Sequence, residues 1–284
     1  MEYTKLSNGL EMPMLGYGVF QIGDEETERC VSDALASGYR LIDTAQAYGN
    51  ERGVGAAMAS SGVARQDIFL VDKVWITNYG DGTTYDSIKR SLELLGTDYI
   101  DLLLLHQAYN DYYGAWRDME RALSEGLVRG IGVSNFDPVR LSDLCAFANV
   151  KPVLNQVETH VFWQQVPAHA TMEKLGVQHM AWGPFAEGAN NFFRNPLLTE
   201  IGEAHGKGVG QVALRYLLDR NVVVIPKSTH KERMQENMDV FDFSLTDAER
   251  DQIAKLDGGK SLIWDHSDPD FIGPWLNQVA ASLK

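Results

Sequence analysis

The sequence predicts an α/β fold of the (β/α)8 type, a TIM barrel. Strand-like and helix-like segments alternate along the chain, and eight such units in 284 residues leave about 35 residues each, the size of a βα repeat. An open doubly wound sheet is the competing arrangement, but no Gly-x-Gly-x-x-Gly motif opens a helix after an early strand. A closed barrel is therefore favoured, with functional residues at the carboxyl ends of its strands.

Strand and helix signals fall in order through the first half of the chain. Two short strands, residues 3–6 and 10–13, flank Asn8-Gly9, a strong hairpin signal, and this N-terminal hairpin is expected to cap the barrel. Hydrophobic runs and helical periodicity then predict strands at residues 15–20, 40–43, 68–74 and 100–106, and helices at residues 25–37, 51–60, 84–95 and 115–125.

The second half continues the alternation. Strands are predicted at residues 129–133, 152–157, 177–182 and 222–225. Asp137-Pro138 starts a helix, and Thr246 to Glu249 form a capping box for a helix that ends at Leu256. Further helices are predicted at residues 166–175, 197–205, 209–219 and 231–238. Residues 257–284 carry Gly and Pro and are interpreted as a tail over the barrel mouth.

Composition favours one domain, residues 1–284, since 44% hydrophobic residues suffice for a full core. Cys30 and Cys145 have no metal-ligand spacing and are interpreted as reduced core residues of a cytoplasmic protein. The start shows no signal peptide, and no apolar run is long enough to cross a membrane. A net charge of −14 argues against nucleic acid and anionic membranes as partners, and a monomer is expected.

Four polar side chains stand at the ends of successive strands. Asp43 and Tyr48 follow the second strand, Lys73 closes the third and His106 closes the fourth. Three of the four have a structural alternative: the Asp caps a turn, the Lys extends to water, and the His is a hydrogen-bonded structural residue. The structural explanations must each be true independently, whereas a single active site explains why all four residues stand at strand ends.

These residue types indicate proton donation to an oxygen. The tyrosine pKa lies near ~10, and a cation at Lys73 is expected to lower the pKa of Tyr48. Asp43 is expected to hold that ammonium, and His106 to orient a carbonyl oxygen. No nucleophile or metal belongs to the set, so it suits carbonyl reduction if a hydride donor lies alongside.

The chain resembles the aldo-keto reductase family over nearly its whole length. The matching motifs are Gly38-Tyr39-Arg40-Leu41-Ile42-Asp43-Thr44-Ala45, Tyr48-Gly49-Asn50-Glu51, Lys73-Val74-Trp75, Leu103-Leu104-Leu105-His106, Gly130-Ile131-Gly132-Val133-Ser134-Asn135-Phe136, Asn155-Gln156-Val157-Glu158 and Ile225-Pro226-Lys227-Ser228. The resemblance implies an NADPH-dependent reductase in which Asp43, Tyr48, Lys73 and His106 form the catalytic tetrad and Tyr48 donates the proton.

The resemblance also implies a site for NADP(H). Ser134, Asn135 and Gln156 match positions that bind the nicotinamide carboxamide, and Glu236 and Asn237 match adenine-binding positions. Lys227, Ser228 and Arg233 follow the last strand, where barrels commonly bind phosphate, and the guanidinium suits a 2′-phosphate. Lys231 beside them leaves open that this is only a solvated basic turn.

Several positions depart from the family pattern. Trp182 stands where a Tyr usually stacks on the nicotinamide, Gly183 where Ser is common, and Gln107-Ala108-Tyr109 where Trp-Pro often follows the His. Phe20, Trp75 and Tyr109 are predicted to line an apolar substrate pocket. Trp264, His266 and Trp275 are predicted either to form a partial lid or to pack within the tail.

The leading hypothesis is an NADPH-dependent reductase of small aldehydes and ketones, dicarbonyls or keto sugars, resembling bacterial diketogluconate and methylglyoxal reductases. One alternative is a non-catalytic dinucleotide-binding regulatory or scaffold subunit. Another is a metal-dependent barrel hydrolase, for which Asp43 and His106 are the candidate ligands; the leading hypothesis assigns no metal.

Overall fold

Eight parallel strands form a closed sheet in the computed structural model, which describes residues 1–283. The strands are hydrogen-bonded in chain order, and a bridge between Leu15 and Val224 joins the first to the last. Gly16 N donates to Val224 O at 2.8 Å across this junction. The strands are β3 (Tyr17–Gly18), β4 (Leu41–Asp43), β5 (Phe69–Val74), β6 (Leu102–Leu105), β7 (Ile131–Ser134), β8 (Leu154–Glu158), β9 (Gln178–Trp182) and β10 (Val223–Val224).

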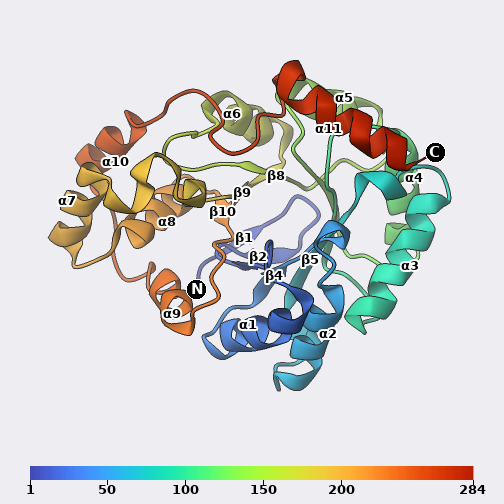
Figure 1. Ribbon diagram of the computed structural model, residues 1–284, viewed down its shortest axis with the longest axis horizontal. Helices are drawn as coiled ribbons and strands as arrows, with labels where there is room; N and C mark the ends of the chain where they lie inside the picture. Colours follow the sequence, from blue (N-terminus) through green and yellow to red (C-terminus); the bar gives the residue numbers. More distant parts are fainter. Residues whose placement is uncertain (284) are drawn as a thin grey trace.

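Helices surround this sheet as an outer ring (Figure 1). They are α1 (Asp24–Ala36), α2 (Glu51–Ser60), α3 (Thr83–Leu95), α4 (Tyr112–Ser124), α5 (Pro138–Phe147), α6 (Val166–Leu175), α7 (Pro196–His205), α8 (Val209–Asp219), α9 (Lys231–Met238), α10 (Asp247–Ala254) and α11 (Pro269–Ser282). Short 3-10 segments are η1 (Gln46–Tyr48), η2 (Arg65–Asp67), η3 (Ile76–Asn78) and η4 (Ala186–Arg194). The predicted TIM-barrel fold is confirmed.

An N-terminal hairpin lies at the amino end of the barrel. Strands β1 (Tyr3–Lys5) and β2 (Glu11–Pro13) pair antiparallel. Thr4 Oγ1 bonds the Gln178 side chain at the start of β9, and Asn8 Nδ2 donates to Arg129 O just before β7. The carboxyl ends of the strands lie at the opposite end and remain available for a site.

The tail contains a helix that was not predicted from the sequence. α11 begins after Asp268, whose side chain accepts hydrogen bonds from Asp270 N and Phe271 N, and Pro269 takes the first helical position. The Asp-Pro signal that predicts α5 is therefore repeated here. Gly273 and Pro274 inside the segment hid the helix, because both residues disfavour a helix interior.

Candidate active site

Lys73 and Asp43 form an ion pair inside the barrel. Val71 of β5 pairs with Asp43 of β4, so Lys73 lies two residues further along the neighbouring strand. Lys73 Nζ donates to Asp43 Oδ1 at 2.5 Å and to Thr44 O at 2.9 Å. Asp43 is 1% exposed and Lys73 is 0% exposed. Gln156 Nε2 donates to the other carboxylate oxygen at 2.8 Å, so each charge has hydrogen-bond partners that offset part of its desolvation.

The pair holds a protonated amine next to the barrel mouth. Burial alone lowers the pKa of Lys73, but Asp43 and Tyr48 together raise it above the usual lysine value. Burial raises the pKa of Asp43, and Lys73 and Gln156 oppose that rise. Lys73 therefore carries a positive charge at neutral pH.

Tyr48 ends the short η1 segment, directly above this amine. Lys73 Nζ lies 3.4 Å from the Tyr48 hydroxyl. Gln46 anchors the turn, because its side chain donates to Ser87 and Ser91 of α3 and accepts from Trp75 N. Gly49 follows with φ of 67°, a left-handed conformation that turns the chain into α2.

The predicted direction of the Tyr48 pKa shift is wrong. Lys73 does lower the pKa of the phenol, but burial raises it more, and the pKa lies above the ordinary tyrosine value. The error arose because the sequence shows the cation and not the depth at which the phenol is held. A raised pKa keeps Tyr48 protonated, which is the state that a proton donor needs.

His106 stands beside Tyr48 as a neutral imidazole. Its ring centroid lies 5.7 Å from that of Tyr48 and 5.1 Å from that of Trp75. Burial, with smaller effects from Lys73 and His266, holds the pKa of His106 well below its usual range. Its Nδ1 atom is buried and has no hydrogen-bond partner within residues 1–283. The ring is thus held by packing, with hydrogen-bonding capacity left for a ligand.

Aromatic side chains surround this group. Phe20 is 49% exposed and its ring lies 5.0 Å from Tyr48. Trp275 of α11 lies 6.0 Å from Trp75 and 6.3 Å from Tyr109. All three predicted pocket residues thus adjoin Tyr48, His106 or the tail. Each of the two interpretations of the tail holds for part of it. Trp275 and His266 contact predicted pocket residues, whereas Trp264 packs on Phe271 and Trp275 within the tail.

Glu158 anchors the tail and was assigned no role from the sequence. It ends β8, and its carboxylate accepts from Ser261 Oγ at 2.6 Å and from Leu262 N at 3.0 Å. Burial raises the pKa of Glu158, but bonds from His160, Ser261 and Leu262 outweigh this and lower it. The only sequence signal for a role of Glu158 was the position of a carboxylate at a strand end. The loop that it contacts lies about a hundred residues further along the chain.

Three residues predicted to hold a carboxamide meet at the ends of β7 and β8. Ser134 pairs in register with Gln156, and its Oγ donates to Gln156 O at 2.8 Å. Asn135 has a left-handed φ of 62°, and its Nδ2 donates to His106 O at 3.0 Å. Trp182 Nε1 donates to Asn135 Oδ1 at 2.8 Å. The Trp182 indole, which stands where the family usually has a Tyr, is therefore connected through Asn135 to the backbone of His106. Gly183 follows Trp182 with a φ of 63°.

The predicted phosphate-binding residues lie after β10. Lys227 and Arg233 are exposed, and neither side chain makes a hydrogen bond or ion pair with another residue of 1–283. Lys231, in contrast, lies 3.5 Å from Asp33. Ser228 Oγ accepts from His230 N and stabilises the turn into α9. Two unpaired cations in a chain of charge −14 suit an anionic ligand.

The predicted adenine-binding residues lie on α9 and face α8. Glu236 Oε1 lies so close to Gly208 that a Cβ there would stand 2.7 Å from it. Asn237 is buried and lies near Gly210. The sequence-predicted cofactor residues thus extend from the ends of β7 and β8 to α9.

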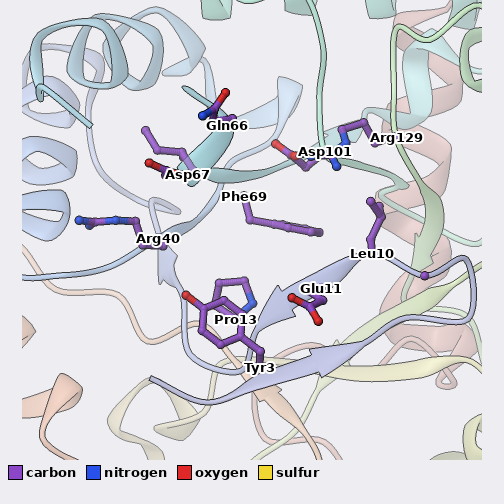
Figure 2. A pocket seen from close by; sticks show the side chains of 12 residues that line it. Tyr3, Leu10, Glu11, Pro13, Arg40, Gln66, Asp67, Phe69, Asp101 and Arg129 are labelled. Atoms are coloured by element: carbon purple, nitrogen blue, oxygen red, sulfur yellow. Dashed lines mark hydrogen bonds and ion pairs between the residues drawn. The ribbon is translucent and has the colours of Figure 1, made fainter. Parts of the chain in front are cut away.

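A cavity of about 590 Å³ lies at the other end of the barrel (Figure 2). Phe69, Pro13 and Leu10 line it together with Arg40 and Arg129. None of the four candidate catalytic residues lines it. We therefore place the site at the carboxyl ends of the strands, where the buried ion pair, the phenol and the imidazole meet.

No helix among residues 1–283 has the length and apolar character needed to cross a membrane. No group of three or more His, Cys, Asp or Glu side chains among them is placed to hold a metal ion.

Comparison with known proteins identifies the family. The profile of the aldo/keto reductase family matches residues 14–258. Morphine 6-dehydrogenase of Pseudomonas putida is 41% identical over 279 residues, covering 93% of this chain and 94% of its own. Glyoxal reductase of Bacillus subtilis is 44% identical over 256 residues, covering 89% and 92%.

A solved structure agrees with these relatives. An aldo-keto reductase of Bombyx mori in complex with NADP superimposes with a TM-score of 0.89 and 33% identity, covering 95% of this chain and 96% of that one. The family match spans most of the barrel, including the strand ends described above. This chain belongs to the aldo/keto reductase family, as its motifs predicted.

Proposed function

We propose that this protein is an NADPH-dependent reductase of small aldehydes and ketones, with Tyr48 as the proton donor. The observation that carries the proposal is the buried Lys73–Asp43 pair, whose amine lies 3.4 Å from the Tyr48 hydroxyl. The related glyoxal reductase supports a carbonyl substrate, and the related silkworm structure, a complex with NADP, supports the cofactor.

Each side chain has a separate task in this reaction. Tyr48 gives its proton to the carbonyl oxygen, and the Lys73 ammonium stabilises the phenolate left behind. Asp43 keeps Lys73 charged and in place. His106 is uncharged, so a ring N–H orients the same oxygen without competing as an acid. NADPH, when bound, supplies the hydride for the carbonyl carbon, and the product is an alcohol.

The residues available for the cofactor fit a phosphorylated dinucleotide. Lys227 and Arg233 have no protein partner within residues 1–283, which leaves both cations available to phosphate oxygens. We assign the carboxamide to Ser134, Asn135 and Gln156, stacking to Trp182 beside Gly183, and the adenine to Glu236 and Asn237. Ser228 shapes the turn from which the phosphate contacts come.

The decisive experiment replaces Tyr48 by Phe. The variant loses the proton and keeps the ring, so kcat for NADPH-dependent aldehyde reduction should fall by about 10²–10⁴-fold. NADPH binding, followed by quenching of tryptophan fluorescence, should be retained. Unchanged turnover in the variant would refute Tyr48 as donor. A wild-type chain that binds NADPH but consumes none with any aldehyde would instead be the non-catalytic subunit.

A second experiment tests the 2′-phosphate. Arg233→Ala should raise the Kd for NADPH by about tenfold or more and leave the Kd for NADH nearly unchanged, because only NADPH carries the extra phosphate. Lys231→Ala is the matched control, since Lys231 is exposed nearby and already lies close to Asp33. Equal weakening of both cofactors by Arg233→Ala would argue against this contact.

We further propose that residues 1–284 act as one domain and one monomer in the cytoplasm. Cys30 and Cys145 are both unpaired and buried, which suits a reducing compartment. Size-exclusion chromatography with light scattering measures the state of assembly directly, and a stable dimer would overturn that part.

A further inference from the structure

Gln46 uses every hydrogen-bonding position of its side-chain amide. Its Nε2 donates to Ser87 Oγ and to Ser91 Oγ, both at 3.1 Å. Its Oε1 accepts from Trp75 N at 2.9 Å and from Asn78 Nδ2 at 2.8 Å. An amide offers two donor hydrogens and two acceptor lone pairs, so all four are occupied. The amide thus connects η1 to α3 and to the segment that follows β5.

The turn that carries Tyr48 is too short to hold itself in place. η1 contains three residues, between Ala45 in an extended conformation and Gly49 in a left-handed one. Its backbone hydrogen bonds run from Tyr48 N to Ala45 O at 2.9 Å and from Gly49 N to Gln46 O at 3.4 Å. A 3-10 turn has poorer hydrogen-bond geometry than an α-helix and little stability of its own. The position of this turn therefore depends on the contacts that its side chains make.

The Tyr48 hydroxyl has one polar contact. Within residues 1–283 its hydrogen-bond partner is Lys73 Nζ, at 3.4 Å. Its ring packs against Phe20, which is about half exposed, and against the edge of His106. None of these contacts would return the hydroxyl to the ammonium if the backbone of η1 moved, because each is made by the ring or hydroxyl that moves with it.

One hydrogen bond of the amide spans the Tyr48–Lys73 pair. Gln46 lies two residues before Tyr48, and Trp75 lies two residues after Lys73. The bond from Trp75 N to Gln46 Oε1 therefore joins the segment that carries the phenol to the segment that carries the amine. The Trp75 ring lies 5.1 Å from that of His106, so the same bond also places a neighbour of the imidazole.

We propose that Gln46 is a positioning residue for proton transfer, whose amide holds the Tyr48 hydroxyl beside the Lys73 ammonium. This inference rests on the proposed reductase function and adds a residue to it. Gln46 acts through Tyr48 and needs no contact with the carbonyl or the cofactor. Misplacing a reacting group by about 1 Å can cost about 10²-fold in rate. Loss of the amide should therefore lower the rate of reduction.

Gln46→Met tests the proposal, because Met keeps the length of the side chain and removes all four hydrogen bonds. The kcat for NADPH-dependent reduction of propanal should fall by about 10–100-fold. The Kd for NADPH should stay unchanged, because the residues assigned to the cofactor lie elsewhere. Gln252→Met is the matched control, since Gln252 is exposed on α10, and its kcat should equal that of the wild type.

The solvent isotope effect separates positioning from a general loss of stability. The measured quantity is the ratio of kcat in H2O to kcat in D2O. In Gln46→Met this ratio should exceed that of the wild type, because transfer of the Tyr48 proton becomes a slower part of the reaction. A variant that was merely less stable would contain less active enzyme, and its isotope effect would equal that of the wild type.

Ser87→Ala provides a second variant, because it removes one partner of the amide and leaves the bond to Trp75 N. It should lower kcat by about threefold and raise the isotope effect, so it decides the question if Gln46→Met does not fold. A wild-type kcat in the folded variant, or a lower kcat with a wild-type isotope effect, would overturn the positioning role. Absence of NADPH consumption by the wild type with every aldehyde would overturn the reductase function itself, so the two failures are distinguishable.

Discussion

Each end of the barrel buries a carboxylate against a cation. At the carboxyl end, Asp43 pairs with Lys73, and the cation is fully buried. At the amino end, Asp101 pairs with Arg65 and Arg129, whose side chains are 24% and 46% exposed. Figure 2 shows Asp101 and Arg129 beside the cavity at this end. The same chemical pair thus occurs in two settings.

The amino-end group is closed. Arg129 bonds Asp101 Oδ1, while Arg65 and Leu70 N bond Oδ2. Arg65 also donates to Thr97 Oγ1 and to two backbone carbonyls. The guanidinium therefore ties together the segments that lead into β5 and β6, and this arrangement serves stability.

The carboxyl-end group is open on one side. Lys73 has protein acceptors in Asp43 and Thr44, and its third contact is the half-buried Tyr48 hydroxyl. That hydroxyl lies where His106 and the aromatic side chains meet. A buried charge supports proton transfer when one of its contacts is itself a proton donor, as Tyr48 is for Lys73, whereas the contacts of Asp101 are two guanidinium groups and a backbone N–H. The contrast predicts that changes at the carboxyl end lower both the reaction rate and the stability, whereas changes at the amino end lower the stability alone.

The largest effect is expected for Lys73→Met. Its loss removes the ammonium beside Tyr48 and leaves Asp43 buried without a cation. Activity should fall by about 100-fold or more, and the free energy of unfolding by about 3 kcal/mol or more. Steady-state kinetics and urea denaturation measure the two effects separately.

The control for that prediction is the double variant Asp43→Asn/Lys73→Met. Removing both charges should recover much of the lost stability, because no uncompensated charge remains, while activity stays low. A double variant that regains activity would show that the pair serves the fold and not the reaction.

A smaller effect, on stability alone, is expected for Arg65→Met at the amino end. The change removes one of two cations from Asp101, so the free energy of unfolding should fall by about 2 kcal/mol. Values of kcat/KM should equal those of the wild type. Arg117→Met is the matched control, since Arg117 pairs with Asp81 at the surface and its loss should leave the free energy of unfolding nearly unchanged. A clear loss of activity in Arg65→Met would remove the distinction between the two ends.

The barrel, and the position of the four polar residues at or just after its strand ends, could be predicted from the sequence because these depend on local signals. Hydrophobic runs locate β5 and β6, and parallel strands bring Asp43 and Lys73 together whatever the details of packing. The contacts of Glu158 with residues 261–264 could not be foreseen, since they join segments far apart in sequence. The pKa direction of Tyr48 was missed for a related reason, because burial is a property of the whole fold.

A third buried carboxyl group, that of Asp72, differs from those of Asp43 and Asp101. Asp72 lies beside Lys73 on β5 and is 0% exposed, but neither of its oxygens has a hydrogen-bond partner within residues 1–283. Burial, followed by the nearby Glu51 carboxyl, raises the pKa of Asp72 well above its usual value. Asp72 is thus a buried acid that keeps its proton where Asp43 and Asp101 have cations.

The last and smallest prediction concerns Asp72→Asn. Because folded Asp72 holds its proton more tightly than unfolded Asp72, its contribution to stability is full below the usual Asp pKa. That contribution is lost as pH rises through the usual value toward the raised one. Asn cannot ionise, so the variant should melt a few degrees above the wild type at pH 8, and the gap should close toward pH 4. Thermal midpoints from pH 4 to pH 9 measure this. A variant less stable than the wild type at pH 8 would mean that the Asp72 carboxylate is stabilised after all, as Asp43 and Asp101 are.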